Sequence, residues 1–358
     1  MKAALLAFLS LGLGAQEIPK TYGQPPTPRA VANVMLALKA GDLATAEGLA
    51  AQYRRMDGDT PEVLQAMGWV ARGELAARQM DKAQQTAAEI VKSAQVALAA
   101  RTLDAEPYLP LALGTAYEVQ AETLFAQGNR AGALQLLQRA LAKWRETSLV
   151  DRLQKNINLM TLQGRPMPPL RASEWIGSKP QPPPAWRGKV VLLLFWAHWC
   201  ADCKAEAPLI AKLGAEMQQR GLVIVAPTRR YGYTIDDDHA APAQETSFIA
   251  KVYERFYAQI PVAGVPLDTG NFQRFGASTT PTIVLVDRRG IVRLYHPGAM
   301  TESELRAALE PLLRAGSSLR PVDARGDAAG LQKGRNAEAN HHGHKDARKG
   351  EAKPALRI

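Results

Sequence analysis

The hydrophobic pattern of the chain changes at about residue 164. Between residues 27 and 164, apolar residues recur at three- and four-residue spacing among Ala, Leu, Gln and Glu, and runs of β-branched residues are rare. This spacing is typical of amphipathic helices, and the composition favours them. The pattern predicts an all-helical domain over residues 27–164.

The clearest unit of this region spans residues 117–140. Small residues stand where two antiparallel helices would touch, and Gly128 with Asn129 is expected to form the turn. The spacing resembles a tetratricopeptide repeat, with weaker copies around Gly41 and Ala83. Their intervals are unequal, so the strict period of about 34 residues is absent. We expect a degenerate array of helical hairpins, which would either bind a protein partner on a concave surface or dimerise or brace the second domain.

From Lys189 onward, short apolar runs alternate with helical segments. The runs predict buried strands over residues 190–196 and 222–226 and further strands over 282–287 and 291–296. The remaining segments predict helices over 200–220, 245–257 and 302–313. This order predicts a sheet covered by helices. The predicted fold class is therefore multidomain, an all-α, TPR-like domain of helical hairpins followed by an α/β domain over residues 188–315.

Three further segments flank these domains. Residues 165–187 are rich in proline, which blocks helix continuation and favours a linker or lead-in strand. Residues 1–15 combine one positive charge, a short apolar run and small residues, so they resemble a secretory signal peptide cleaved near Ala15, although a buried first helix would fit the same residues. Residues 316–358 have few large apolar side chains and are expected to form a disordered basic tail.

Composition and charge narrow the function classes. Hydrophobic residues make up 46% and charged residues 22% of the 358 residues, which is ordinary for a soluble globular protein. The formal net charge is +10, but no basic stripe is interleaved with aromatic residues, and the tail carries part of the excess. We therefore expect no nucleic-acid partner.

Cys200 and Cys203 are the only two cysteines of the chain. At a strand-to-helix junction, the first cysteine of such a pair lies at the helix N-terminus, where N–H groups and the helix dipole stabilise a thiolate. Cys200 is then the nucleophile and Cys203 the resolving thiol. Three other interpretations are less favoured. Half of a zinc site would need a second pair of ligands, which is missing, and an inert buried pair would not be expected to open a helix. A peroxidase would carry a lone peroxidatic cysteine instead of a close pair.

Two separated motifs resemble the TlpA/ResA-like branch of the thioredoxin family. They are Phe195-Trp196-Ala197-His198-Trp199-Cys200-Ala201-Asp202-Cys203-Lys204-Ala205-Glu206-Ala207-Pro208 and Thr279-Thr280-Pro281-Thr282-Ile283-Val284-Leu285-Val286-Asp287-Arg288-Arg289-Gly290. The resemblance implies a thioredoxin fold and a thiol–disulfide oxidoreductase whose only redox group is the Cys200–Cys203 disulfide, with no cofactor or metal. It also implies that Pro281 is a cis-proline facing the disulfide, that Thr280 offers its backbone to an extended substrate strand, and that Trp199 supports substrate binding.

The sequence departs from the wider family in three places. Leu194 stands where thioredoxin has a buried aspartate, so Cys203 must lose its proton by another route. The segment 228–233 lacks an acid expected by resemblance to ResA-type proteins, and the acidic triplet 236–238 is either a substitute or a solvated loop. His198 precedes the motif, either as an exposed gate for thiolate formation or, preferably, as a partly buried neighbour of the helix start.

The residues beside the cysteines bear on the direction of the reaction. A carboxylate at Asp202 disfavours a second negative charge and so stabilises the disulfide, which favours a reductant, whereas Lys204 acts in the opposite sense. Residues 1–15 predict an exported or periplasmic protein that is soluble after signal cleavage. The resemblance implies that it reduces specific protein thiols, such as those handled in cytochrome c maturation or at copper sites, and a membrane electron donor is a possible partner. The alternatives are an oxidant in disulfide formation and a scaffold protein. Metal binding by the tail residues His341, His342 and His344 is a further alternative.

Overall fold

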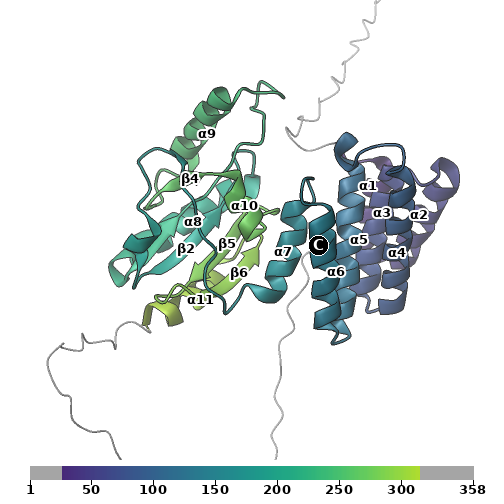
Figure 1. The fold of residues 1–358 in the computed structure, drawn as a ribbon, viewed down its shortest axis with the longest axis horizontal. Coiled ribbons are helices and arrows are strands. Elements are labelled where there is room, and N and C mark those ends of the chain that lie inside the picture. The colour runs from purple at the N-terminus through teal and green to yellow at the C-terminus, as the bar shows by residue number, and fades with distance from the viewer. Residues whose placement is uncertain (1–25, 315–358) are drawn as a thin grey trace, which may run out of the picture.

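The computed structural model describes residues 26–314, which form a helical domain followed by an α/β domain, as the hydrophobic pattern predicts (Figure 1). The predicted signal peptide at residues 1–15, the tail at 316–358 and its histidines lie outside the described residues. None of the helices in the described part of the chain combines the length and apolar character needed to cross a bilayer. The helices of the first domain are α1 (Arg29–Lys39), α2 (Leu43–Asp57), α3 (Pro61–Ala76), α4 (Met80–Ala97), α5 (Tyr108–Ala126), α6 (Arg130–Lys143) and α7 (Val150–Thr161), with the short η1 (Leu103–Ala105) before α5.

Helices α1 to α6 form three successive hairpins. One residue with positive φ lies in each turn: Gly41 (φ 76°), Arg78 (φ 60°) and Gly128 (φ 82°). The Asp42 and Asn129 side chains then accept backbone N–H groups of α2 and α6, which satisfies donors that a helix start leaves free. The weak repeat in the sequence therefore corresponds to repeated hairpins, while the tetratricopeptide class stays a prediction. A fully buried alanine follows each turn at the same distance: Ala46, Ala83 and Ala133.

The second domain is built on a four-stranded sheet in the order β3-β2-β5-β6. Strand β2 runs parallel to β3 and antiparallel to β5, and β5 pairs with β6 in the antiparallel sense. All six residues of β2 are buried because helices cover both faces of the sheet. The strands are β1 (Glu174–Ile176), β2 (Val190–Phe195), β3 (Leu222–Val225), β4 (Val265–Leu267), β5 (Thr282–Val286) and β6 (Val292–Pro297).

Alternate residues of β2 belong to two separate cores. Leu192 and Leu194 pack with α8 (Ala201–Met217), α9 (Pro242–Phe256) and α11 (Glu302–Arg314), whereas Leu193 and Phe195 pack with α10 (Thr269–Phe275) and with Leu162 at the end of α7. The predicted strands and helices are present to within a few residues. The helix expected over 200–220 is α8 followed by the 3₁₀ turn η3 (Gln218–Arg220).

The sequence pattern missed three short elements of this domain. Strands β1 and β4 have three residues each and form a separate antiparallel pair, and α10 has seven residues. The proline-rich lead-in therefore contains a strand, β1, and then a 3₁₀ turn, η2 (Pro183–Trp186). Elements this short carry too few positions for a period to be recognised.

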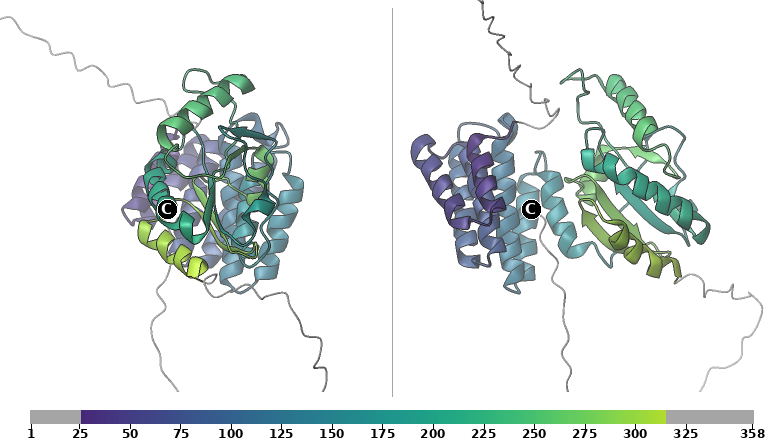
Figure 2. Two further views of the ribbon diagram at one scale, coloured as in Figure 1. Left: turned by 90° about the vertical axis from the view of Figure 1, so that its left-hand side faces the viewer. Right: turned by 180° about the vertical axis from the view of Figure 1, so that it is seen from behind.

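Helix α7 connects the two domains. Figures 1 and 2 show it between the other helices and the sheet. Leu153 belongs to the core of the helical domain, and Leu162 belongs to the core on one face of the sheet. Gly276, which ends α10 in the left-handed conformation (φ 60°), lies so close to α7 that a Cβ there would be 2.3 Å from the backbone nitrogen of Lys155. The domains are therefore packed directly against each other.

Candidate active site

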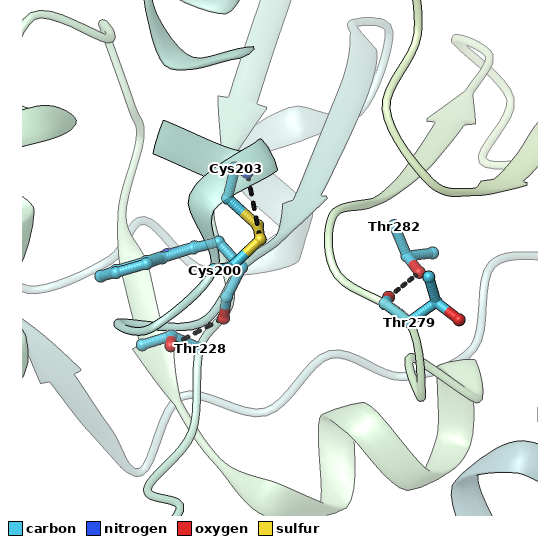
Figure 3. The surroundings of a disulfide bond; sticks show 6 residues. Cys200, Cys203, Thr228, Thr279 and Thr282 are labelled. Carbon is cyan, nitrogen blue, oxygen red and sulfur yellow. Dashed lines mark hydrogen bonds between the residues drawn. A yellow bond between two sulfur atoms is a disulfide. The ribbon is translucent and has the colours of Figure 1, made fainter. Parts of the chain in front are cut away.

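Cys200 and Cys203 form a disulfide where β2 passes into α8. The S–S distance is 2.08 Å, and Cys200 is the N-cap of the helix. The backbone N–H of Cys203 donates to Cys200 Sγ over 3.0 Å. Figure 3 shows the disulfide at the start of the helix, with the Thr279–Thr282 turn across from it. In the reduced chain the same N–H and the helix dipole would stabilise a thiolate on Cys200.

A groove of about 540 Å³ opens in front of the disulfide. It brings together most of the residues singled out from the sequence: His198, Trp199, Cys200, Asp202, Lys204 and Thr280. Cys203 is fully buried behind Cys200, which is itself only 3% exposed. The first cysteine is therefore the one that an incoming sulfur can reach. Also lining the groove are Ala201, Tyr233, Thr234, Ile235, Phe248, Ser278 and Thr279.

Residues 278–280 form one wall of the groove, which we call the proline wall. The Thr280–Pro281 bond is cis, as the resemblance implied, although Pro281 itself is not among the lining residues. The Thr282 hydroxyl donates to the carbonyl oxygen of Thr279 over 2.6 Å (Figure 3). Within residues 26–314 no hydrogen bond engages the backbone of Thr280. Its N–H and C=O are therefore free to pair with an extended chain.

The opposite wall, which we call the loop wall, is made by residues 233–235 and by Phe248 of α9, and Tyr231 and Gly232 come directly before it in the chain. The Glu245 carboxylate, 1% exposed, accepts the backbone N–H groups of Tyr231 and Gly232 and lies 3.3 Å from His198 Nε2. Burial lowers the pKa of His198 even though Glu245 favours its charged form. With 2% exposure, His198 is a buried support of the loop wall and not an exposed gate.

Two charged side chains lie at the rim of the groove. Asp202 is exposed in the first turn of α8, two positions after Cys200. Burial, together with the charge of Arg255, lowers the pKa of Lys204, whose Nζ lies 5.2 Å from the ring centre of Phe256. The Asp202 carboxylate is therefore better hydrated than the Lys204 ammonium group.

Glu206 is a site residue that sequence reasoning missed. It follows Cys203 by three positions on α8, so helical geometry places the two on the same face. Burial raises the pKa of its carboxyl to about 7, although the N–H of Met300 donates to Oε1 over 2.8 Å. Its Oε2 is buried and has no hydrogen-bond partner among the described residues. The three-residue spacing from Cys203 was the signal that could have identified it.

The other acidic candidate does not reach the groove. Asp236 and Asp238 are exposed, and no member of the triplet 236–238 is a lining residue, so it is a solvated loop. Leu194, at the position where thioredoxin has an aspartate, is fully buried and pairs with Ile283 in the sheet. Glu206 is thus the buried carboxyl on the helix that carries the cysteines.

Comparison with known proteins gives partial matches to the α/β domain. The family described as "Thioredoxin-like domain" matches residues 187–312. The chain is 27% identical over 127 residues to the thiol-disulfide oxidoreductase ResA of Geobacillus thermodenitrificans, and 28% identical over 124 residues to the thioredoxin-like protein YneN of Bacillus subtilis. These alignments cover 36% and 35% of this chain and 65% of each relative, so the chain spans just under two thirds of their length.

A third relative and a solved structure match the same region. The thiol:disulfide interchange protein DsbE of Pseudomonas fluorescens is 27% identical over 155 residues, which are 42% of this chain and 77% of the relative. A crystal structure of a putative DsbE from Chlorobium tepidum is 27% identical, with a TM-score of 0.29, and covers 36% of this chain and 84% of that one. Together with the sheet order, the cysteine pair and the cis-proline, the family match identifies residues 187–312 as a thioredoxin-like domain.

Proposed function

We propose that the chain is an exported thiol–disulfide oxidoreductase that reduces disulfides of specific envelope proteins through Cys200 and Cys203. The observation that carries the proposal is the disulfide at the N-terminus of α8, at the base of a groove whose proline wall leaves the Thr280 backbone free. An extended segment of a substrate would pair with Thr280 and bring its sulfur to Cys200.

The reaction begins from the reduced pair. The Cys200 thiolate attacks one sulfur of a substrate disulfide; a new S–S bond forms, the substrate S–S bond breaks, and one substrate cysteine leaves as a thiolate. Cys203 then attacks Cys200, which restores the disulfide seen here and releases the second substrate thiolate. Two electrons pass from the dithiol to the substrate, so an external reductant, proposed to be a membrane electron donor, must restore the pair.

Glu206 would accept the proton that Cys203 loses before this second attack. Its raised pKa of about 7 lets the carboxyl gain and release a proton near neutral pH. The buried Leu194 cannot hold a proton, so Glu206 would take over the role that an aspartate on β2 has in thioredoxin. Glu206 is in this scheme a positioning and proton-holding group of the resolving step.

The direction of the reaction is tested by the reduction potential of the Cys200–Cys203 pair. Exposed Asp202 beside the helix start disfavours the thiolate and so favours the oxidised pair, which makes the reduced protein a reductant. Titration in dithiothreitol or glutathione buffers, read by thiol alkylation, should give a value near the roughly −270 mV of thioredoxin. A value near about −120 mV would indicate an oxidant of folding proteins instead.

Export is proposed from residues 1–15 and is tested separately. N-terminal sequencing of the chain recovered from the cell envelope should begin after Ala15. Retention of Met1 in a cytoplasmic fraction would contradict export without affecting the redox chemistry.

The rival function is an interaction protein in which the helical hairpins recruit a partner and the thioredoxin-like domain is a scaffold. Replacing both Cys200 and Cys203 by serine distinguishes the two, because a scaffold does not need the thiols. Unchanged partner capture and an unchanged cellular effect of that variant would favour the scaffold.

A further inference from the structure

The segment that leads from β3 to the loop wall passes next to the helical domain. It contains Arg229, whose Nη1 lies 2.6 Å from Oδ2 of Asp151 in the first turn of α7. Asp151 is 6% exposed, and its other carboxylate oxygen, Oδ1, is buried without a hydrogen-bond partner among the described residues. Arg229 is thus the group that compensates the buried charge of Asp151, and the two domains are tied by a partly buried ion pair.

The guanidinium of Arg229 also packs against two aromatic rings. Its Cζ lies 5.0 Å from the ring centre of Tyr231 and 4.8 Å from that of Phe272. Asp151 and Tyr231 raise the pKa of Arg229 against the opposing effect of burial, so the group stays charged. The Asp151 carboxylate therefore holds the Arg229 guanidinium, and the guanidinium in turn fixes the plane of the Tyr231 ring.

Tyr231 in turn contacts the two residues that precede Cys200. Its ring centre is 5.5 Å from that of Trp199 and 5.6 Å from that of His198, in both cases edge to face. The same residue donates its backbone N–H to Glu245 of α9. Tyr231 is therefore held by the helical domain through its ring and by the α/β domain through its backbone.

We propose that Asp151 and Arg229 are positioning residues of the redox site, through which the helical domain completes the loop wall and sets how a peptide segment reaches Cys200. This inference rests on the proposed function and adds to it a role for the helical domain. The occupant of the groove is an extended peptide around the substrate cysteine. A small disulfide touches Cys200 without needing the wall.

Asp151→Asn in the full chain tests the inference, because it keeps the shape of the side chain and removes its charge. The reduced protein is mixed with two probes that share a leaving group. One is a single-cysteine peptide, with apolar residues beside the cysteine, disulfide-linked to glutathione; the other is glutathione disulfide. The rate of glutathione release gives a second-order rate constant for each probe.

The variant should react about tenfold more slowly with the peptide probe and within about twofold of wild type with glutathione disulfide, since only the peptide uses the wall. The equilibrium constant of the Cys200–Cys203 pair with glutathione should stay within about twofold of wild type, because no group touching the sulfurs has changed. Asp151→Glu keeps the charge and should recover most of the peptide rate. Arg229→Lys keeps the charge and loses the planar stacking, so it should be slow with the peptide and provides a second variant if Asp151→Asn does not fold.

Glu174→Gln is the matched control. It breaks the ion pair of the adjacent Arg230, whose partner Glu174 lies on β1 and not in the helical domain. It should react with both probes like wild type. Asn158→Ala, which removes a hydrogen bond from α7 to the carbonyl oxygen of Arg274, controls for loosened docking and should do the same.

Four outcomes would overturn the inference: a wild type that is no faster with the peptide than with glutathione disulfide, an Asp151→Asn variant that keeps the peptide rate, an equal loss for both probes, or an equal loss in Glu174→Gln. A wild type that reacts with neither probe would instead overturn the proposed function, and this inference with it.

Discussion

The two walls of the groove are held in place by different means. The proline wall leads directly into β5, and its turn is closed by a bond between residues three positions apart, Thr282 and Thr279. The loop wall lies outside the sheet and depends on Glu245 and Asp151. These two contact the segment just before it, at Tyr231 and Arg229, across 14 and 78 positions of sequence. The comparison teaches that one wall is a local consequence of the strand, whereas the other is set by buried charges from distant helices.

The largest effect is expected where the two walls meet, at the cysteines. Cys203→Ser removes the resolving thiol, so turnover should fall roughly a thousandfold or more and a mixed disulfide between Cys200 and the substrate should accumulate. Mass spectrometry of the trapped complex measures it. Cys200→Ser should trap nothing, and trapping by that variant would show that Cys203 is the nucleophile.

Loss of the buried carboxylate should damage the loop wall next most strongly. Glu245→Gln replaces an acceptor of two backbone N–H groups by an amide that turns a donor toward one of them, which should lower the free energy of unfolding by about 3 kcal/mol. Denaturant unfolding of wild type and variant measures the difference. If Glu245→Gln lowered the free energy of unfolding by less than the proline-wall variant Thr282→Val, the comparison between the walls would be reversed.

The helix that carries the cysteines should respond to pH through its buried residue Glu206. Its pKa is about 7 in the folded chain against 4.5 as the reference value, so the folded state keeps a proton that the unfolded state has released between these values. The contribution of the protonated carboxyl to stability is fully present below about pH 4.5 and is lost as pH rises through 7. Over this window the difference in unfolding free energy between wild type and Glu206→Gln should change by about 3 kcal/mol, at about 1.4 kcal/mol per pKa unit.

Unfolding measured at several pH values tests this expectation, because the glutamine variant lacks the titration. Parallel pH profiles for the two proteins would contradict the raised pKa. An exposed acid such as Glu216, replaced by glutamine, provides the control.

The smallest effect is expected in the proline wall. Thr282→Val keeps the side-chain shape in β5 and removes the hydroxyl that donates to Thr279, which should cost about 1 kcal/mol of stability. Because the strand still leads into the wall, the rate of peptide reduction should change little. A loss of reactivity as large as that of Glu245→Gln would mean that the proline wall is held no more locally than the loop wall.

The sequence was sufficient to predict the larger elements of the fold. Strands β2, β3 and β5 are mostly apolar runs bounded by turn residues, β6 follows the turn at Gly290, and the hairpins carry small residues at their contacts. Strands β1 and β4 were missed because three residues define no period and their pairing joins segments about 90 positions apart. Helix α10 begins at a capping aspartate, Asp268, which alone was too weak a signal.

The candidate site was predicted only where motifs describe it. Cys200, Cys203 and the cis bond before Pro281 follow from short runs of sequence. Arg229 and Glu245 could not be assigned, because their role depends on which helices pack against the loop, and spacing along the chain carries no such information. Their partners become visible only once the domains are docked.

Helix α7 has a consequence for any attempt to dissect or recombine this chain. The change in sequence pattern suggests a cut at the proline-rich segment 165–187, yet α7 contributes Leu153 to one core and Leu162 to the other. A fragment that begins after this helix would start with an uncovered sheet face and an unbalanced Arg229. In a chimaera, α7 therefore has to travel with the thioredoxin-like domain, and the unit that is inherited and exchanged as one piece begins near residue 149.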